Sequence, residues 1–306
     1  MAFRPESLGS FAGKAVLVTG ANAGIGWQTA AEFARHGATV TLACRNLEKA
    51  DRAADRIRAL IPGSDVRVGE LNLAALSSVR KFADGWTGSL DVLINNAGVM
   101  APPSWRATED GFELQFATNH LGHYALTGLL LPHLLTAGSA RVVTVSSLAH
   151  GGGDASVLFG NPAQGYRPRK AYSNSKLANL LFGLELQRRA EATPSALTST
   201  LAHPGVAATN LFLSKDGLGA NPVIRGLGTV FGRVLFQSAR AGALPTLYAA
   251  TEAAPGSYSG PRWPGEIRGS VGPAAISPTG LDAGLAAQLW DLSAELTEVE
   301  YEFGLQ

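Results

Sequence analysis

Short apolar segments alternate with segments of helical character from residue 14 onward. Most of the short segments, such as KAVLVTG and LDVLINNAG, are apolar without interruption, which is typical of strands buried on both faces. The segments between them have helical periodicity, and GIGWQTAAEFARHG ends at Gly37, a frequent helix-terminating residue. Buried strands joined by helices form a parallel sheet covered on both faces. The alternation therefore predicts an α/β fold with a doubly wound parallel sheet.

Six strands are expected, within residues 14–20, 38–45, 65–71, 90–98, 140–147 and 196–205. Asn46 is a plausible cap for the helix after the second strand, because its side chain can accept a hydrogen bond from a free backbone N–H. A long helix is expected over residues 111–135, and a further helix should begin near Tyr172.

The chain has 306 residues, of which 46% are hydrophobic, and we find no repeat, low-complexity tract or Pro/Gly linker in it. We therefore expect residues 1–306 to form a single domain. Two segments depart from the alternation: residues 148–170 are predicted to be a long loop, and residues 211–238 mix apolar residues with glycine. Both follow carboxyl ends of strands, where open α/β sheets bind ligands. The second segment is interpreted either as an apolar substrate lid or as part of the core.

Charge is balanced, with 25 Lys and Arg against 24 Asp and Glu. This gives no electrostatic reason to expect nucleic acid or an anionic membrane as a partner. The single cysteine, Cys44, excludes an internal disulfide and is expected to be a buried strand residue. No segment approaches the ~18 consecutive apolar residues of a membrane-spanning helix, and no signal peptide is recognisable. These features predict a soluble, cytoplasmic protein without an integral membrane segment.

A glycine-rich loop, VTGANAGIG, closes the first strand and opens the first helix. Its glycines, Gly20, Gly24 and Gly26, follow the spacing T-G-x-x-x-G-x-G. Glycines allow a sharp turn and the close approach of a pyrophosphate, and the helix N-terminus supplies free N–H groups and a positive dipole end. The loop predicts a dinucleotide site; the alternative is a turn in which the glycines serve packing alone.

Arg45 ends the second strand, and residues 42–46 contain no carboxylate. In dinucleotide folds an acidic residue here usually holds the ribose 2′-hydroxyl, whereas a guanidinium suits a 2′-phosphate. Arg45 therefore favours NADP (NADPH) over NAD, unless it is only a solvated loop charge.

Tyr172 and Lys176 lie four residues apart, on one face of the expected helix. A free tyrosine has a pKa near ~10, too high for good acid–base catalysis at neutral pH. A nearby ammonium favours the phenolate and lowers that pKa, so the pair predicts a proton-transfer site. The alternative is an exposed ring beside a solvated charge.

Six motifs together resemble the short-chain dehydrogenase/reductase family, and within it the retinol-dehydrogenase-like branch and its bacterial relatives. They are TGANAGIG, NNAG, the asparagine of ATNHLGHYAL, VTVSS, YSNSK and HPGVAATN, and they occur in the family's order between Gly13 and Thr209. The resemblance implies a Rossmann-type fold and an NADP-dependent oxidoreductase that interconverts an alcohol and a carbonyl.

The resemblance also assigns catalytic roles. Tyr172 would exchange a proton with the substrate oxygen, and Lys176 would also hydrogen-bond the nicotinamide ribose. Ser147 would orient the substrate oxygen, whereas Ser146 points to the other face of the strand and is expected to be structural. Asn119 would anchor a water that links Lys176 to solvent.

The resemblance implies cofactor contacts at the carboxyl ends of the expected parallel strands. Two departures from the family stand out: Asn72 replaces an aspartate that usually binds the adenine amine, and the loop between Ser147 and Tyr172 is longer than in many members. The expected cofactor-binding residues are Gly20, Asn22, Ala23, Gly24, Ile25, Gly26, Arg45, Asn72, Leu73, Asn96, Ala97, Gly98, Tyr172, Lys176, Pro204, Gly205, Val206 and Thr209.

No metal site is expected. His120 and His123 lack a carboxylate or cysteine at ligand spacing and are expected to be packing residues, and His203 is expected to be a satisfied loop histidine.

The expected substrate is a lipophilic small molecule, because apolar residues dominate segment 211–238. The helix after Tyr172 and the helix near ALTGLLLPHLL are apolar on more than one face, which suggests a homodimer or homotetramer. Two other functions stay open: an NADP-binding sensor or scaffold without turnover, and a tetrapyrrole (protochlorophyllide-type) reductase on the same fold.

Overall fold

The computed structural model describes residues 3–206 and 237–304. Its centre is an eight-stranded sheet in the order β3-β2-β1-β4-β5-β6-β7-β8. All neighbouring strands are parallel except β7 and β8, which are antiparallel. The predicted doubly wound α/β fold is confirmed, and the strand bounds are β1 Ala15–Thr19, β2 Thr39–Cys44, β3 Val66–Glu70, β4 Val92–Asn95, β5 Arg141–Val145, β6 Thr198–Ala202, β7 Tyr258–Pro261 and β8 Val271–Pro273.

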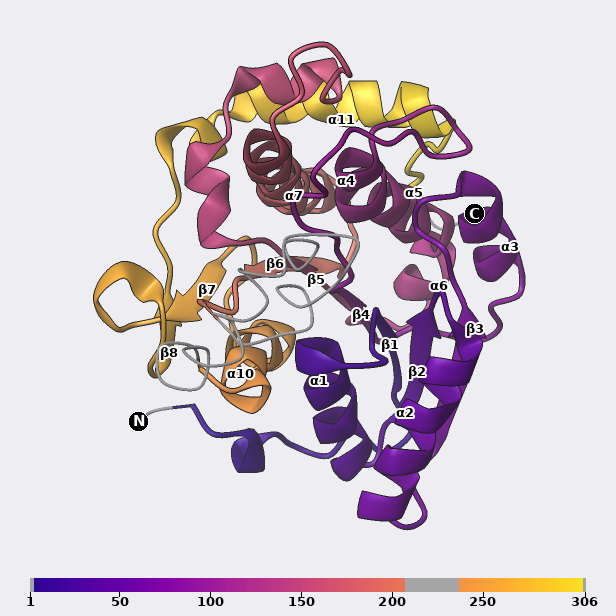
Figure 1. Ribbon diagram of the computed structural model, residues 1–306. Helices are drawn as coiled ribbons and strands as arrows, with labels where there is room; N and C mark the ends of the chain where they lie inside the picture. Colours follow the sequence, from indigo (N-terminus) through magenta and orange to yellow (C-terminus); the bar gives the residue numbers. More distant parts are fainter. Residues whose placement is uncertain (1–2, 207–236, 305–306) are drawn as a thin grey trace.

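Successive side chains of β1 point to opposite faces of the sheet and pack in different hydrophobic clusters. Val16 and Val18 pack with α1 (Gly24–Arg35), α2 (Leu47–Leu60) and α10 (Ala239–Thr251) on one face of the sheet. Leu17 packs on the other face, with residues of α3 (Leu76–Asp84), α5 (Gly122–Leu129) and α7 (Pro168–Glu191). Figure 1 shows the sheet between these helix layers. Burial on both faces explains the continuous apolar strands of the sequence.

Two predicted helix signals are confirmed around α1 and α2. Gly37 follows α1 in a left-handed conformation, with φ of 88°, which favours glycine over other residues. Asn46 caps α2, since its side chain accepts a hydrogen bond from the Lys49 N–H at 2.8 Å.

The long helix predicted over residues 111–135 is divided. It consists of α4 (Leu114–Phe116), a π-helical turn (Ala117–Leu121), α5 and α6 (Leu131–Leu135). Pro132 explains the break before α6, because proline has no N–H to continue the helical hydrogen bonds. The π-helical turn has one more residue per hydrogen-bonded turn than an α-helix, and Asn119 lies within it.

Segment 148–170 is more ordered than the predicted loop. It contains the 3₁₀ helices Leu148–Gly152 and Ala155–Phe159, and α7 begins at Pro168 rather than near Tyr172. Pro168 suits the first turn of a helix, where its missing N–H costs no hydrogen bond. Tyr172 therefore lies in the second turn of an established helix. Further short 3₁₀ helices span Pro5–Ser7, Pro264–Glu266 and Pro278–Leu281.

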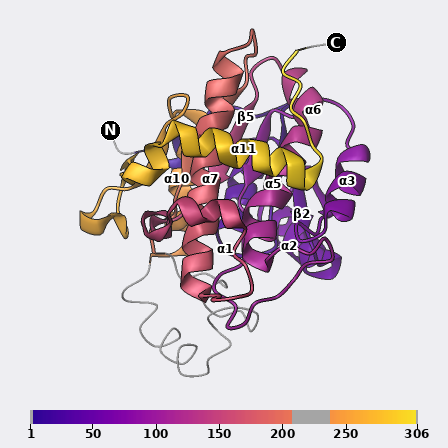
Figure 2. The same cartoon turned by 90° about the horizontal axis from the view of Figure 1, so that it is seen from above.

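Helix α11 (Ala283–Thr297) was not predicted from the sequence. Figure 2 shows it crossing α7 and α5. Its Leu285 and Leu289 pack with Leu177 and Leu181 of α7, and Trp290 packs against Phe182. The additional apolar face of α7 is therefore covered within the chain, so the observation that suggested an oligomer no longer requires a partner subunit.

The predicted substrate lid falls largely outside the described residues, which resume at Gln237. Ser238 caps α10 by accepting a hydrogen bond from the Ala241 N–H at 3.2 Å. Over residues 3–206 and 237–304, no helix combines the length and the hydropathy needed to cross a bilayer.

Candidate active site

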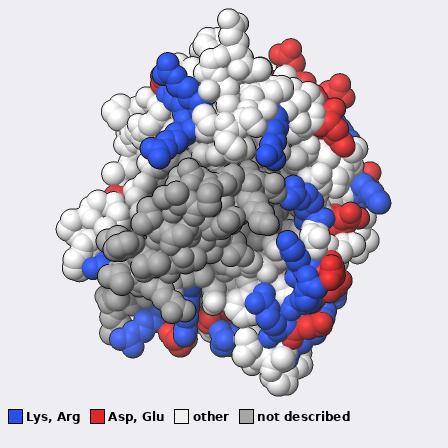
Figure 3. Space-filling view, viewed as in Figure 1, with Lys and Arg blue, Asp and Glu red and all other residues white. Residues whose placement is uncertain are grey.

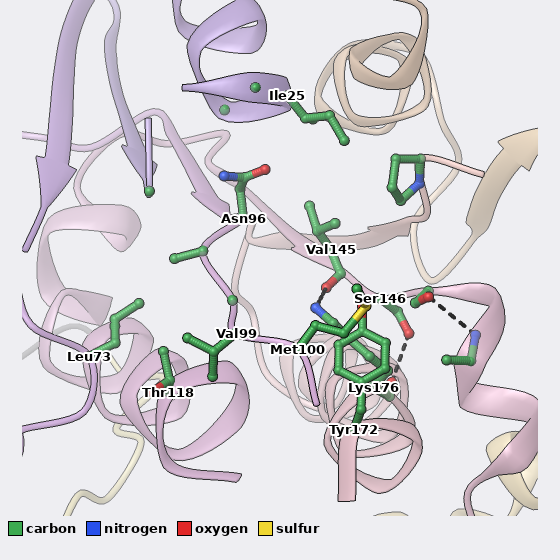
Figure 4. Close-up of a pocket in the computed structure, with 18 of the residues that line it drawn as sticks. Ile25, Leu73, Asn96, Val99, Met100, Thr118, Val145, Ser146, Tyr172 and Lys176 are labelled. Atoms are coloured by element: carbon green, nitrogen blue, oxygen red, sulfur yellow. Dashed lines mark hydrogen bonds between the residues drawn. The ribbon is translucent and has the colours of Figure 1, made fainter. Parts of the chain in front are cut away.

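A cavity of about 700 Å³ lies at the carboxyl ends of the parallel strands. Figure 4 shows Tyr172 and Lys176 beside Val145 and Ser146, with Ile25 across the cavity. Nearly all the residues predicted for cofactor or substrate line it: Gly20, Asn22, Ala23, Gly24, Ile25, Gly26, Arg45, Asn72, Leu73, Asn96, Ala97, Gly98, Ser147, Tyr172, Lys176, Pro204, Gly205 and Val206. Asn119 lies behind this wall, and Thr209 is outside the described residues.

The glycine loop has both packing and binding features. A Cβ on Gly26 would lie 2.5 Å from Asn96 Nδ2 and 2.9 Å from the Gly20 carbonyl oxygen, so the helix can approach the strand ends only with glycine. No side chain caps the N-terminus of α1 at Ala23, and the first residues of α1 line the cavity. Uncapped N–H groups at a helix N-terminus fit the pyrophosphate of a dinucleotide. The cradle therefore fits the expected cofactor.

Arg45 and Asn72 lie at the ends of β2 and β3, on the glycine-loop side of the cavity. Arg45 is exposed, and among the described residues it forms no ion pair. The side-chain oxygen of Asn72 accepts a hydrogen bond from the Ala74 N–H at 3.2 Å, while the Ser78 hydroxyl accepts one from the Asn72 N–H at 3.0 Å. Asn72 thus stabilises the turn into α3 in addition to lining the cavity.

The hydroxyl groups of Tyr172 and Ser147 both belong to the cavity wall. Burial raises the pKa of Tyr172 to about 12, and the Ser147 hydroxyl opposes this shift. Lys176 was expected to lower this pKa below its ordinary value. The structure shows the opposite shift, because the desolvation of the phenolate has the larger effect. The phenol therefore keeps its proton at neutral pH.

Lys176 is buried, and its Nζ donates a hydrogen bond to the Val145 carbonyl at 3.1 Å. Burial lowers the pKa of Lys176 to about 8. Its Nζ would lie 3.6 Å from a Cβ placed on Gly98, and Asn119 Oδ1 would lie 3.2 Å from the same position. Glycine at residue 98 therefore lets the NNAG turn pass close to both side chains.

Asn119 holds the cavity wall through its side chain. Its Oδ1 accepts a hydrogen bond from the Val99 N–H at 2.8 Å, and its Nδ2 donates to the Val99 carbonyl at 3.0 Å and to the Ser175 hydroxyl at 2.9 Å. These contacts fix Val99, which lines the cavity. The water that Asn119 was expected to anchor remains a prediction.

A family model described as short chain dehydrogenase matches residues 14–216. The chain belongs to this family. Human retinol dehydrogenase 13 is 41% identical over 292 residues, which cover 94% of this chain and 86% of the human protein. Human retinol dehydrogenase 12 is 38% identical, over 95% of this chain and 88% of that protein. The predicted retinol-dehydrogenase-like branch is thus confirmed.

Solved structures agree with this assignment. A crystal structure of an uncharacterized protein from Mycobacterium paratuberculosis has 46% identity and a TM-score of 0.82, and each chain covers 100% of the other. A protein assigned as an NAD(P)-dependent gluconate 5-dehydrogenase from Beutenbergia cavernae, with NADP bound at low occupancy, has 25% identity and a TM-score of 0.62 over 81% of this chain and 95% of that one. Family membership makes the chain an oxidoreductase of alcohol and carbonyl groups whose fold binds NAD(P).

In this short-chain dehydrogenase, His123 has a connection to the site that the sequence analysis missed. Its Nδ1 hydrogen-bonds the Asn119 carbonyl at 2.9 Å, and its Nε2 lies 2.9 Å from the Thr19 hydroxyl. That hydroxyl accepts hydrogen bonds from the Asn96 and Ala97 N–H groups, both at 2.9 Å. His123 therefore connects the NNAG turn to the π turn. In the sequence, only its position four residues after Asn119, on the same helical face, could have indicated this contact.

The remaining predicted side chains of this dehydrogenase have structural partners. Ser146 donates its hydroxyl to the Lys176 carbonyl at 2.7 Å, as expected for a structural residue. His120 is buried and lies 2.8 Å from the Ser293 hydroxyl. His203 is fully buried and pairs with Glu266 at 3.0 Å. Burial raises the pKa of Cys44 to about 11, as befits an unreactive strand thiol.

The cavity of the enzyme is basic. Within the described part of the chain its lining includes Arg45, Arg169 and Lys176 but no Asp or Glu. On the face in Figure 3, Lys and Arg side chains lie above and to the right of the centre and also along the lower edge, with Asp and Glu among them at the right and at the bottom. Over α2 the charges are mixed, and Arg52 pairs with Glu48. The charged side chains in the described lining of the cavity are thus all cationic.

Proposed function

We propose that this short-chain dehydrogenase is an NADP(H)-dependent enzyme that interconverts an alcohol and an aldehyde or ketone on a lipophilic small molecule. The observation that carries the proposal is that Tyr172, Ser147 and Lys176 line the same cavity as the glycine loop. A protein that only bound the dinucleotide would have no need of a proton donor at this position.

Tyr172 and Ser147 act on the substrate oxygen. The dinucleotide supplies or accepts the hydride when bound. In reduction, Ser147 donates a hydrogen bond to the carbonyl oxygen, and Tyr172, protonated because its pKa is about 12, gives its proton to that oxygen as negative charge develops there. In oxidation, Tyr172 takes the alcohol proton back. Lys176 stabilises the phenolate left after reduction and binds the ribose next to the nicotinamide.

The preference for NADP rests on Arg45. Its guanidinium is exposed at the cavity, free of ion pairs among the described residues, and follows a strand end without a carboxylate. A 2′-phosphate would add charge-assisted hydrogen bonds there, whereas NAD offers only a hydroxyl.

The lipophilic substrate is supported by the wall near Tyr172, where Val99, Met100, Leu148 and Ala149 line the cavity. The names of the relatives add an apolar aldehyde, retinal, as a candidate. The single, buried cysteine supports a cytoplasmic location as part of the proposal. A homodimer or homotetramer stays a proposal, now without support from α5 and α7.

The test follows NADPH and NADH absorbance with retinal and a panel of other aldehydes, ketones and quinones. Wild-type protein should turn over apolar carbonyl compounds, and Tyr172→Phe should be slower by roughly 10²–10⁴-fold, the range for general acid catalysis. Circular dichroism confirms that the variant is folded. Equal rates for wild type and Tyr172→Phe would rule out the proposed mechanism.

A further inference from the structure

Arg169 is the cationic residue of the cavity for which the proposed mechanism has no role. It lies in the first turn of α7 and lines the cavity together with Tyr172 and Ser173 of the same helix. The other two cationic side chains in the described lining have assigned roles, since Arg45 is assigned to the 2′-phosphate and Lys176 to the phenol and ribose. Arg169 is three residues before Tyr172, so the two side chains share one face of α7.

The guanidinium of Arg169 has no partner among the residues that the structure describes. Among residues 3–206 and 237–304 it forms neither a hydrogen bond nor an ion pair, and no carboxylate of that part lines the cavity. Its neighbour Lys170 is different, because it pairs with Asp154 at 2.7 Å and donates to the Gly152 carbonyl at 2.9 Å. Of these two adjacent cations, the one at the cavity is therefore available to a ligand.

The backbone beside Arg169 is anchored. The side chain of Gln115 donates to the Pro168 carbonyl at 3.2 Å, and it accepts a hydrogen bond from the Ala101 N–H at 2.7 Å. The same side chain donates to the Tyr166 hydroxyl at 2.9 Å. Gln115 is fully buried, and Ala101, which also lines the cavity, is held in a left-handed conformation with φ of 48°. The backbone next to Arg169 is thus held in place by hydrogen bonds, whereas the Arg169 side chain itself is exposed to solvent.

We propose that Arg169 binds a carboxylate on the substrate, and that the natural substrates are amphipathic: an apolar body with an alcohol or carbonyl at one end and a carboxylate farther along. The inference rests on the proposed function of the same site. Three residues of helix rise by about 5 Å, so the carboxylate lies roughly one helical turn from the reacting oxygen. The apolar side chains of Val99 and Met100 contact the body between the two polar ends. A guanidinium binds a carboxylate through two parallel hydrogen bonds, which gives orientation as well as affinity.

Two aldehydes that differ only in charge test the inference: para-formylbenzoate and its methyl ester. Wild-type enzyme should show a higher kcat/KM for the acid than for the ester. Arg169→Gln should lower kcat/KM for the acid about tenfold, mainly through KM, and change the ester less than about twofold, as expected for a charge-assisted hydrogen bond that solvent partly screens. Arg169→Lys should restore part of the preference, because it keeps the charge and loses the planar fork.

Arg167→Gln is the matched control, because Arg167 is an exposed arginine two residues earlier that does not line the cavity. An equal loss in Arg167→Gln and Arg169→Gln would overturn the inference in favour of a general surface field, as would an unchanged preference in Arg169→Gln. Calorimetric binding of para-formylbenzoate provides a readout that does not need turnover. Weaker binding in Arg169→Gln, in a protein that reduces neither aldehyde, would support the carboxylate site while rejecting the proposed function.

Discussion

The Nζ atom of Lys176 lies 5.9 Å from the centre of the Tyr172 ring and donates its hydrogen bond to the Val145 carbonyl. The two side chains share a helical face, yet burial affects each of them more than their proximity does. It raises the pKa of Tyr172 to about 12 and lowers that of Lys176 to about 8. The lysine, rather than the tyrosine, is therefore the group of this pair that titrates near physiological pH.

The pH dependence of carbonyl reduction follows from these two groups. The ammonium of Lys176 is present below its pKa and is lost as the pH rises through about 8, whereas Tyr172 keeps its proton over the same interval. We expect kcat/KM for reduction to be level below this pKa and then to fall by up to about tenfold per pH unit. The fall should be absent in Lys176→Met and present in Lys170→Met. A level wild-type profile up to pH ~10 would contradict the role of the ammonium.

Arg45→Ala should raise KM for NADPH about tenfold or more and leave KM for NADH within about twofold, because a charge-assisted hydrogen bond to a phosphate contributes roughly 1.5–3 kcal/mol. Initial-rate kinetics with each dinucleotide measure the effect. Arg52→Ala is the control, since Arg52 is exposed on α2 and paired with Glu48. Equal losses with the two dinucleotides in Arg45→Ala would show that the residue does not distinguish them.

His123→Asn should reduce both stability and turnover, because the Asn119 carbonyl and the Thr19 hydroxyl would lose a buried partner. We expect a loss of roughly 1–3 kcal/mol in the free energy of unfolding. The substitution should also lower kcat, since the NNAG turn lines the cavity and the π turn carries Asn119. Chemical denaturation and steady-state kinetics measure the two effects.

His120→Asn is the matched control for that prediction. His120 is equally buried, but its partner is Ser293 of α11, on the side away from the cavity. This variant should lose stability and keep the wild-type kcat. If both variants retained kcat, the contact of His123 would be structural only.

The α/β alternation and the location of the cavity at the strand ends could be predicted from the sequence, because each depends on local patterns. Continuous apolar runs mark buried strands, and a parallel sheet brings the residues after each strand to one edge. Gly20, Asn96, Ser147 and Pro204 are far apart in the chain, yet all of them follow strands and line one cavity.

The features that were missed depend on contacts between distant segments. The apolar excess of α7 did not reveal whether a partner or the chain itself covers it; α11, about a hundred residues later, does so. The pKa of Tyr172 depends on how deeply the ring is buried, which spacing to Lys176 does not determine. Only the break before α6 had a visible local signal, Pro132, which should have ended the predicted helix.

Trp290 is the residue of α11 that packs against both α7 and α5. Its ring lies 5.9 Å from that of Phe182, 5.2 Å from Tyr124 and 4.5 Å from Tyr301, and the Arg189 guanidinium carbon is 4.5 Å from its centre. Trp290→Ala should cost about 3–5 kcal/mol of unfolding free energy, since it removes a large buried ring and leaves a cavity.

Trp263→Ala is the matched control, because Trp263 is 52% exposed and should cost less than about 1 kcal/mol. Light scattering on Trp290→Ala tests the covering role as well: loosening α11 exposes the apolar face of α7, so this variant should associate more than wild type. A Trp290→Ala protein as stable as Trp263→Ala, with unchanged mass in solution, would mean that α11 does not hold this face closed.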